Sequence, residues 1–232
     1  MSSYDISAVS MRELVQDAWA LRSQFDLSNM GYGKVHWGDM RQVVTTPFSY
    51  YFFLAGIARL TGARHIVEVG THQGGSTRAL AAGFTDPRGS KLVTFDVTEF
   101  GARMFKGHAS IKAYTLDANS EAAFQTCLRE FGEPRMDLAF IDSTHEFWPT
   151  FQSFNLYAAM LECPLVVLDD ITLNESMARL WDLIRSRYGK ENTIDASDVD
   201  AAIRVGDGTR PGFGIVRIPP IESRAHASSQ AR

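Results

Sequence analysis

Five short apolar runs recur along the middle of the chain, and each ends in or beside a polar residue. They are HIVEVG at 65–70, KLVTFD at 91–96, IKAYTLD at 111–117, MDLAFID at 136–142 and PLVVLDD at 164–170. Runs this short and continuous are typical of parallel strands that are buried on both faces. A further run, FGIVRI at 213–218, follows the turn-rich GDGTRPG and predicts a late strand.

The segments between these runs have the length and period of helices. The clearest begins at Phe147, where apolar residues recur every three or four positions up to Leu161 and would form one stripe against the sheet. Helices are also predicted at 10–25, 47–60 and 174–188. Alternating strands and helices favour right-handed crossovers, so the chain is predicted to be an α/β protein with a doubly wound, mostly parallel sheet. Ligands of such sheets lie beyond the carboxyl ends of the strands.

The predicted elements divide the chain into three parts. Residues 1–60 form an N-terminal helical segment packed on the core, residues 61–221 form the α/β domain, and residues 222–232 are a small, polar tail that we expect to be disordered. A glycine-rich, aromatic stretch at 29–40 joins the first two helices and is a candidate lid or wall of a substrate site. The 232 residues, 45% of them apolar, are enough for one domain with a substantial core.

Composition narrows the class of partner. The 27 acidic and 23 basic residues give a net charge of −4, which offers no electrostatic footprint for nucleic acid or an anionic membrane, so a small-molecule partner is expected. The two cysteines have no CxxC spacing and predict neither a disulfide framework nor a thiolate zinc site. The beginning of the chain lacks a signal-peptide pattern, and the longest apolar run, 50–58, is too short to span a membrane. We therefore expect a cytoplasmic protein, and the apolar N-terminal helices are compatible with a homodimer or higher homo-oligomer.

A glycine-rich loop, GTHQGGST at 70–77, follows the first of the five runs. Its glycines would let the backbone approach a ligand closely as the chain turns into a helix, which we expect Ser76 or Thr77 to cap. The loop is neither GxGxxG nor a lysine-containing phosphate loop. Glu68 also argues against a phosphate, and it suits a positively charged ligand such as the amino group of S-adenosylmethionine. A tight turn that binds nothing is the alternative.

Two aspartates extend this candidate pocket. Asp96 ends the second run, where a carboxylate can accept hydrogen bonds from both hydroxyls of a ribose. Asp117 ends the third run, near where the edge of an adenine would lie. Either aspartate could instead cap a helix or a turn. Together with the loop they outline an adenosine pocket, which does not by itself separate S-adenosylmethionine from a nicotinamide dinucleotide.

Three more carboxylates end the fourth and fifth runs: Asp142, Asp169 and Asp170. Side by side they would repel one another and raise one another's pKa values, and a bound divalent cation would relieve that cost. Oxygen ligands favour magnesium, with calcium or manganese as alternatives, over zinc. His145, three residues after Asp142, could remove a proton from a hydroxyl coordinated to the metal, a role worth roughly 10²- to 10⁴-fold in rate. The acids could instead cap helices, and His145 could be an ordinary loop residue.

The order of these motifs resembles the class I S-adenosylmethionine-dependent methyltransferases. It is most similar to the metal-dependent O-methyltransferases of the catechol and caffeoyl-coenzyme A type and to their antibiotic-tailoring relatives. The resemblance runs from about Val44 to Thr172 and rests on TTPFSYYFFLAGIARL, VEVGTHQGGST, FIDSTHEF and VVLDDI. It implies a Rossmann-like class I methyltransferase domain at 61–221.

The resemblance also implies a role for each site residue. The methyl donor would be bound by Glu68, Gly70, Thr71, Gly74, Ser76, Asp96, Asp117, Ala118 and Asp142. The metal would be held by Asp142, Asp169 and Asp170, and His145 would be the catalytic base. The implied activity is transfer of a methyl group from S-adenosylmethionine to a metal-chelated hydroxyl of a small molecule, a natural product or a phenol.

Some positions depart from the family pattern. Where the catechol-type enzymes have a lysine base this chain has His145, and where they have an asparagine ligand it has Asp170, which favours the antibiotic-tailoring branch. Glu162-Cys163-Pro164 replaces the usual glycine-rich turn. Candidates for the acceptor pocket are Trp37, Phe147, Trp148 and Arg179.

Other functions and other acceptors stay open. A hydroxylase of an antibiotic pathway with the same fold, a nicotinamide-dependent oxidoreductase and a non-catalytic binding protein are the alternatives. The acceptor could be a phenol, a catechol, a sugar hydroxyl or an antibiotic precursor.

Overall fold

A computed structural model describes residues 4–28, 48–203 and 212–220, and the backbone of 34–37 and 40–43. The predicted tail at 222–232 lies outside these residues, as does much of the stretch at 29–40.

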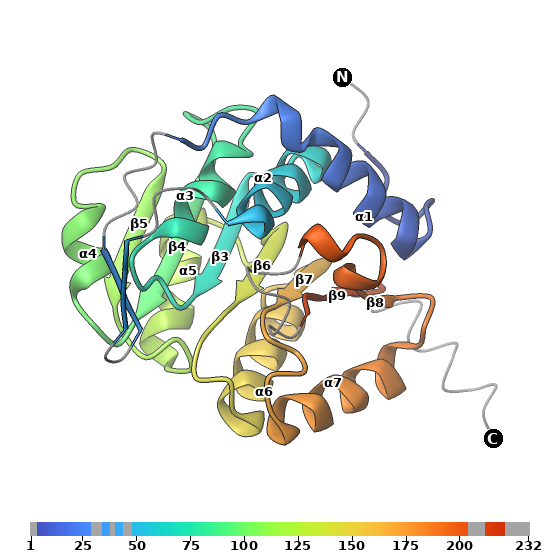
Figure 1. The fold of residues 1–232 in the computed structure, drawn as a ribbon. Coiled ribbons are helices and arrows are strands. Elements are labelled where there is room, and N and C mark those ends of the chain that lie inside the picture. The colour runs from blue at the N-terminus through green and yellow to red at the C-terminus, as the bar shows by residue number, and fades with distance from the viewer. Residues whose placement is uncertain (1–3, 29–33, 38–39, 44–47, 204–211, 221–232) are drawn as a thin grey trace.

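One seven-stranded sheet forms the centre of the protein (Figure 1). Its strands are β3 (His65–Val69), β4 (Lys91–Asp96), β5 (Ile111–Thr115), β6 (Leu138–Ile141), β7 (Leu165–Leu168), β8 (Thr193–Asp195) and β9 (Gly214–Arg217). They are arranged in the order β5-β4-β3-β6-β7-β9-β8, in which the first five are parallel and β9 is antiparallel to both of its neighbours. The doubly wound, mostly parallel sheet predicted from the five apolar runs is confirmed, and the late strand is β9.

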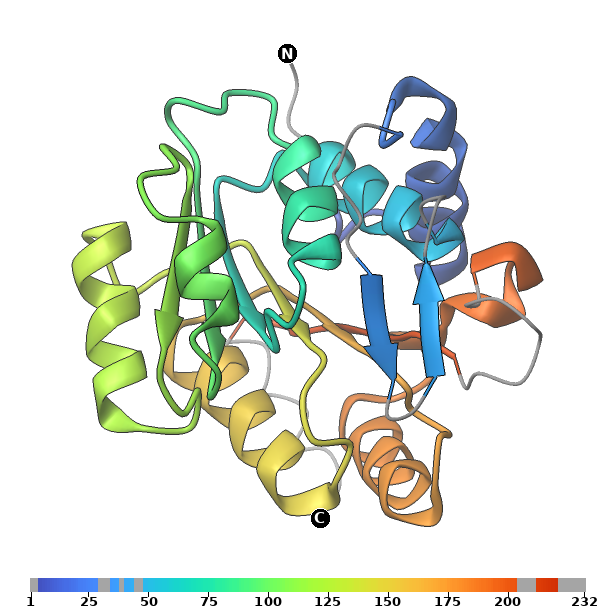
Figure 2. The same ribbon diagram turned by 60° about the vertical axis from the view of Figure 1, so that its left-hand side comes forward.

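Helices cover both faces of this sheet (Figures 1 and 2). They are α1 (Met11–Ala20), α2 (Ser49–Thr61), α3 (Gly75–Ala82), α4 (Phe100–Met104), α5 (Glu121–Phe131), α6 (Phe147–Asn155) and α7 (Glu175–Tyr188). Side chains of α1, α2 and α3 pack in one apolar cluster with Ile66 of β3, while α5, α6 and α7 pack in a second with the adjacent Val67. Successive residues of a strand point to opposite faces, so one continuous apolar run supplies both clusters.

Local chemistry sets where several helices begin. Ser10 and Glu13 form a reciprocal capping box at the start of α1. Ser120 caps α5 and Asn174 caps α7, each by accepting a backbone N–H three residues later. Left-handed Gly62 ends α2.

Shorter elements complete the chain and modify two predictions. The helix predicted at 10–25 is α1 followed by the 3₁₀ turn η1 (Leu21–Gln24), and the stripe from Phe147 to Leu161 is α6 followed by the π-helical turn η2 (Leu156–Met160). Two further 3₁₀ turns, η3 (Ala196–Asp198) and η4 (Ala201–Ile203), follow β8. The strand β8 and a separate hairpin of β1 (Lys34–Trp37) and β2 (Met40–Val43) were not predicted from the sequence.

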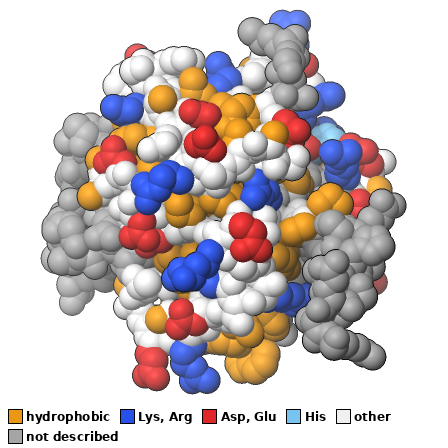
Figure 3. All heavy atoms as spheres, turned by 90° about the vertical axis from the view of Figure 1, so that its right-hand side faces the viewer, with side chains coloured by type: hydrophobic (Ala, Val, Ile, Leu, Met, Phe, Trp, Pro, Cys, Tyr) orange, Lys and Arg blue, Asp and Glu red, His pale blue; other side chains and the backbone are white. Residues whose placement is uncertain are grey.

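The face shown in Figure 3 carries acidic and basic side chains interspersed among apolar ones. This distribution agrees with the small net charge of the chain and shows no concentration of one sign on that face. Within the described part of the chain, no helix combines the length and the apolar character needed to cross a membrane.

Candidate active site

Sheet register brings the predicted site residues to one edge. Val69 of β3 pairs with Phe95 of β4 and with Ile141 of β6, which in turn pairs with Leu168 of β7. The residue after each of these four is a predicted site residue. Gly70, Asp96, Asp142 and Asp169 therefore stand in a row at the carboxyl ends of four adjacent strands.

The backbone of Gly70 lies directly against that of Asp142. Its φ of 97° is unfavourable for a residue with a side chain, and a Cβ there would overlap the carbonyl oxygen of Asp142. The backbone N–H of Asp142 also donates to the carbonyl of Val69 at 2.9 Å. The start of the glycine loop and the first acid are thus fixed against each other.

The predicted cap of α3 was wrong. The N-cap is Gly74, with a left-handed φ of 71°, and no side chain caps the helix. Ser76 and Thr77 lie inside the first turn and instead donate to the two carboxylate oxygens of Glu68, at 2.6 and 2.5 Å.

Glu68 is fully buried beneath this loop. Thr94 also donates to its carboxylate, at 2.7 Å, and Thr71 and Thr94 share a hydrogen bond of 2.6 Å. Burial raises the pKa of Glu68 to about 7, against the lowering effect of the three hydroxyl donors. In this structure Glu68 orients the loop, and its assignment to the amino group of the methyl donor stays a prediction.

Asp96 is held over the loop by backbone and side-chain donors. The N–H of His72 donates to Oδ2 at 2.8 Å, and the N–H and hydroxyl of Thr98 donate to Oδ1 at 2.8 and 2.9 Å. The carboxylate is only partly buried, so it is oriented in advance and still open to a ligand. This arrangement suits the predicted contact with a ribose.

The predicted adenine-side residues form a turn beyond the sheet. β5 ends at Thr115, so Asp117 lies two residues past the strand, exposed, and accepts the N–H of Asn119 at 2.9 Å. Ala118 is buried, and its carbonyl accepts a 2.7 Å hydrogen bond from the hydroxyl of Tyr157 in the π-helical turn. The turn is thereby tied to the end of α6.

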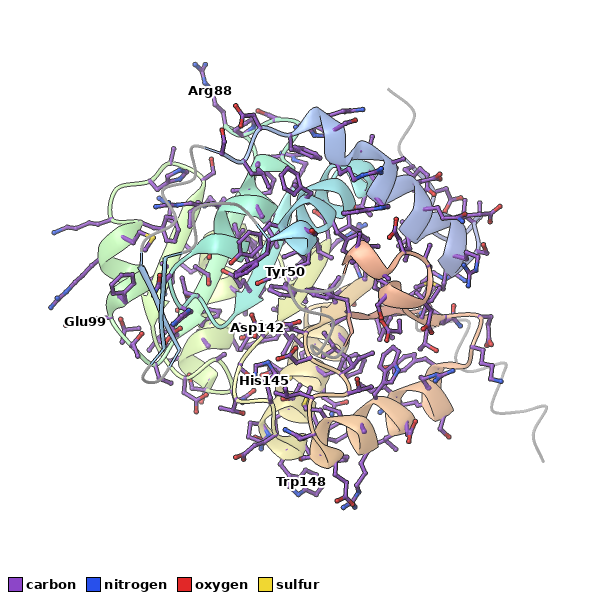
Figure 4. The ribbon with its side chains drawn as sticks, in the orientation of Figure 1. Tyr50, Arg88, Glu99, Asp142, His145 and Trp148 are labelled. Atoms are coloured by element: carbon purple, nitrogen blue, oxygen red, sulfur yellow. The ribbon has the colours of Figure 1, made fainter. Side chains whose placement is uncertain are left out.

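The predicted metal residues and base converge, and Figure 4 labels two of them, Asp142 and His145. Asp142, His145 and Asp169 each offer a ligand atom, and these atoms lie within 4.8 Å of one another. Nε2 of His145 is 3.2 Å from Oδ1 of Asp142 and 3.4 Å from Oδ2 of Asp170. All four predicted residues are therefore in one cluster, although the group whose ligand atoms all lie within 4.8 Å of one another contains His145 in place of Asp170.

Two of the three acids in this cluster are buried at an energetic cost. Asp169 and Asp170 are 7% and 8% exposed. Burial, followed by the negative charges of Asp142 and Asp170, raises the pKa of Asp169 well above its ordinary value. The oxygen-rich donor set and this mutual repulsion both fit a divalent cation.

The backbone is also strained here. Four non-glycine residues of the described chain have positive φ, and two of them are His145 and Asp170, each at 53°. The side-chain amide of Asn174, the residue that caps α7, donates a hydrogen bond of 3.0 Å to the backbone carbonyl of His145. Such conformations cost free energy and concentrate at functional sites.

Sequence reasoning did not assign two residues next to this cluster, Tyr50 and Tyr51 of α2. Both are buried, at 6% and 8% exposure, and the charges of Asp142 and Asp169 act on both hydroxyls. Their only signal in the sequence was the stretch TTPFSYYFFLAGIARL, which supported the resemblance without giving either tyrosine a role.

The candidate acceptor residues differ in exposure. Trp148 is 68% exposed near the start of α6, in edge contact with the partly buried Phe147. Arg179 is exposed on α7, and the side chain of Trp37 lies outside the described residues.

Residues 67–171 match a family model described as a methyltransferase domain. This match contains the glycine loop, Asp96, His145 and the three acids of the cluster. No curated protein sequence matches the chain.

Three solved structures share the fold. An O-methyltransferase from Bacillus cereus in complex with SAH is 17% identical over 89% of this chain and 91% of its own, with a TM-score of 0.55. The O-methyltransferase TomG from Streptomyces achromogenes, involved in tomaymycin synthesis, is 20% identical over 92% and 93%, with a TM-score of 0.53. CalS11, a TDP-rhamnose 3'-O-methyltransferase of calicheamicin biosynthesis, is 16% identical over 93% and 100%, with a TM-score of 0.52.

The fold is therefore the Rossmann-like fold of class I methyltransferases. The segment that carries the site is similar to the methyltransferase domain family, and the resemblance stated from the sequence is confirmed to this extent.

Proposed function

We propose that this protein is an S-adenosylmethionine-dependent O-methyltransferase that transfers a methyl group to a hydroxyl of a small molecule, a natural product or a phenol. The observation that carries the proposal is the direct contact of the glycine loop with the acid cluster at Gly70 and Asp142. A methyl donor in the loop and an acceptor at the acids would be neighbours, as an in-line transfer requires.

The methyl donor would occupy the carboxyl ends of β3, β4 and β5. The partly exposed Asp96, already fixed by His72 and Thr98, would accept the ribose hydroxyls. The turn at Asp117 and Ala118 would face the adenine edge. Glu68 would hold the loop in shape from below, through Ser76 and Thr77.

The acid cluster would hold a divalent cation through Asp142, Asp169 and Asp170, and we propose magnesium because all the ligands are hard oxygens. When bound, such a cation lowers the pKa of a hydroxyl that coordinates it. A hydroxyl bound at these carboxylates would lie close to His145, whose Nε2 is 3.2 Å from Oδ1 of Asp142.

His145 would act as the general base. The acceptor oxygen attacks the methyl carbon of the sulfonium, the bond between that carbon and sulfur breaks, and S-adenosylhomocysteine leaves. The proton of the hydroxyl passes to Nε2 of His145, the nitrogen that faces Asp142 and Asp170 in the structure. We assign His145 the role of base because the three carboxylates already supply an oxygen ligand set.

The antibiotic-tailoring branch is favoured for the acceptor. TomG and CalS11 serve tomaymycin and calicheamicin synthesis, and both share the fold along nearly their whole length. The histidine and the third aspartate of this chain pointed to the same branch from sequence. A natural-product hydroxyl is accordingly the first class of acceptor to screen.

Isothermal titration of the metal-stripped protein tests the proposal. S-adenosylmethionine, NAD and magnesium are titrated in parallel into the wild type, Asp169→Ala and Asp86→Ala, whose exposed aspartate lies in the turn between α3 and β4. We expect binding of S-adenosylmethionine and not NAD, and a magnesium signal that is lost in Asp169→Ala and kept in Asp86→Ala. Binding of NAD alone would favour an oxidoreductase and overturn the proposal.

A further inference from the structure

The end of α6 buries a polar group that packing alone does not require. Tyr157, in the π-helical turn η2, is fully buried, and its hydroxyl donates a 2.7 Å hydrogen bond to the carbonyl of Ala118. A phenylalanine would fill the same place without burying a hydroxyl, which is costly unless that group is hydrogen-bonded. The hydroxyl of Tyr157 therefore serves the turn that contains Ala118.

A second buried hydroxyl of the same helix binds this turn, which consists of residues 117–120. The hydroxyl of Ser153 donates to Oδ1 of Asn119 at 2.8 Å, and Nδ2 of Asn119 donates to the carbonyl of Pro149 at 3.2 Å. Both ends of the asparagine amide are thus bound to α6. Together with Tyr157, three residues spaced four positions apart along one helix hold a single turn.

The π-helical turn helps to bring Tyr157 into line with Pro149 and Ser153. Residues four apart on an α-helix are offset by about 40° around its axis, because 3.6 residues make one turn. A π-turn closes i→i+5 hydrogen bonds and so contains more residues per turn, which reduces this offset for Tyr157. Single π-turns are frequent at functional sites, and here the turn keeps three contacts on one face of the helix.

The turn at 117–120 presents an exposed carboxylate, that of Asp117. Its Oδ1 accepts the N–H of Asn119 at 2.9 Å, and the backbone carbonyl of Asp117 accepts the hydroxyl of Ser120 at 2.6 Å. A carboxylate held in this way can accept a hydrogen bond from the amino group of an adenine. Hypoxanthine has an oxo group at that position, which is itself an acceptor and gives the carboxylate nothing to bind.

The same helix begins beside the proposed base. Phe147, the first residue of α6, follows His145 by two positions, and its N–H donates to the hydroxyl of Ser176 on α7 at 2.8 Å. The helix is therefore fixed on α7 at its start and on the turn at 117–120 along its buried face. One helix connects the adenine side of the donor site to the loop of His145.

We propose that Tyr157 and Ser153 are positioning residues for the methyl donor: they hold the turn at 117–120 on α6, so that Asp117 selects adenine over other purine bases. This inference rests on the proposed function, because it assumes that the adenine of the donor lies at this turn. Without the hydroxyl of Tyr157 the carbonyl of Ala118 loses its bond to the helix, and the turn is freer to move. A carboxylate that is fixed in advance needs less ordering when the ligand binds, so a looser turn costs selectivity.

Titration calorimetry with two ligands that differ only at this edge of the purine tests the inference. S-adenosylhomocysteine carries the amino group, and S-inosylhomocysteine carries an oxo group in its place. In the wild type we expect the adenosyl ligand to bind at least about tenfold more tightly, the effect of one hydrogen bond to a charged group. In Tyr157→Phe and in Ser153→Ala we expect this ratio to fall by about threefold or more.

Tyr4→Phe is the matched control. The hydroxyl of Tyr4 also donates a 2.7 Å hydrogen bond, to Asp17 of α1, and α1 packs on the opposite face of the sheet from α6. Removing that hydroxyl should leave the ratio of the two affinities at its wild-type value. Thermal melts confirm that each variant folds, and Ser153→Ala decides the matter if Tyr157→Phe does not fold.

The outcomes separate this inference from the proposed function. A wild type that binds neither ligand overturns both. A wild type that binds the two ligands equally, or variants that keep the wild-type ratio, overturns the inference and leaves the methyltransferase proposal standing. Variants that lose affinity for both ligands in equal proportion also overturn it, because a merely structural role would weaken both alike.

Discussion

Nε2 of His145 lies 3.2 Å from Oδ1 of Asp142, and the two residues are three positions apart on the loop that follows β6. The left-handed backbone of His145, with φ at 53°, accompanies this close approach. For a residue with a Cβ this conformation costs on the order of 1 kcal/mol, so the surrounding contacts must hold it in place. The capping residue of α7, Asn174, supplies one of them by binding the carbonyl of His145.

The first prediction concerns His145 as the base. In His145→Gln we expect kcat for methyl transfer to fall by about 10²- to 10⁴-fold, because the proton of the acceptor has no base to receive it. Binding of magnesium and S-adenosylhomocysteine should change by less than about threefold, well under the loss in rate. Rates with an acceptor found by screening and calorimetry make the comparison.

His65→Gln serves as the control, since His65 is at the amino end of β3, opposite the site, and should keep full activity. Loss of magnesium binding in His145→Gln would show instead that His145 is a metal ligand.

The second prediction concerns Gly70. Alanine there would be strained at φ 97° and would overlap the carbonyl of Asp142, so we expect Gly70→Ala to lower the free energy of unfolding by about 3 kcal/mol or more. Gly132→Ala has a similar φ of 76° but no atom within 4 Å of its Cβ, and should cost about 1 kcal/mol. Urea denaturation of both variants measures the difference. Equal losses would show that the contact with Asp142 has no energetic weight.

The row of acids could be predicted from the sequence alone. Parallel strands end at the same edge of a sheet, so apolar runs that finish in Asp96, Asp142 and Asp169 are enough to place these residues together. The register confirms this placement, because Phe95, Ile141 and Leu168, which precede the three acids, lie level with one another across four adjacent strands through Val69 of β3.

Other features depend on tertiary contacts that a local pattern does not contain. The cap of α3 was assigned to Ser76 or Thr77 because hydroxyl residues prefer that position, but Glu68 binds both hydroxyls and Gly74 begins the helix. The face of α2 that meets the acids could not be read from an apolar helix in which Phe53–Ala58 are all buried, with no alternation of polar and apolar positions. The three-residue strand β8 is defined by its pairing with β9 and has too short a pattern of its own.

The third prediction concerns pH. Burial raises the pKa of Glu68 to about 7, so the folded state holds a proton that the unfolded state releases at about 4.5. The stability due to this proton is fully present below pH 4.5 and is lost as pH rises through 7, a change on the order of 3 kcal/mol.

Glu68→Gln removes this titration. With magnesium saturating, urea unfolding at pH 5 and pH 8 should show a larger fall in stability for the wild type than for the variant. The same fall in both proteins would mean that Glu68 stays ionised throughout this range.

The last prediction concerns the charge of the acid cluster. Burial and the neighbouring acids raise the pKa of Asp169, so the metal-free protein is destabilised as pH rises above about 4, the ordinary pKa of an aspartate. Asp169→Asn removes that charge and keeps an oxygen that can accept the 2.9 Å hydrogen bond from the N–H of Asp170. At pH 7.5 without metal we therefore expect the variant to melt at a higher temperature than the wild type.

Magnesium should reverse this order. A cation at 100 times its Kd stabilises the folded wild type by about 2.7 kcal/mol, whereas the variant has lost one ligand and gains little. Melting curves with EDTA and with magnesium measure the crossing, and Asp86→Asn, an exposed aspartate, should behave as the wild type in both. If the wild type were the more stable protein even in EDTA, the three acids would not repel one another in the empty site, and the argument from their repulsion to a bound cation would fail.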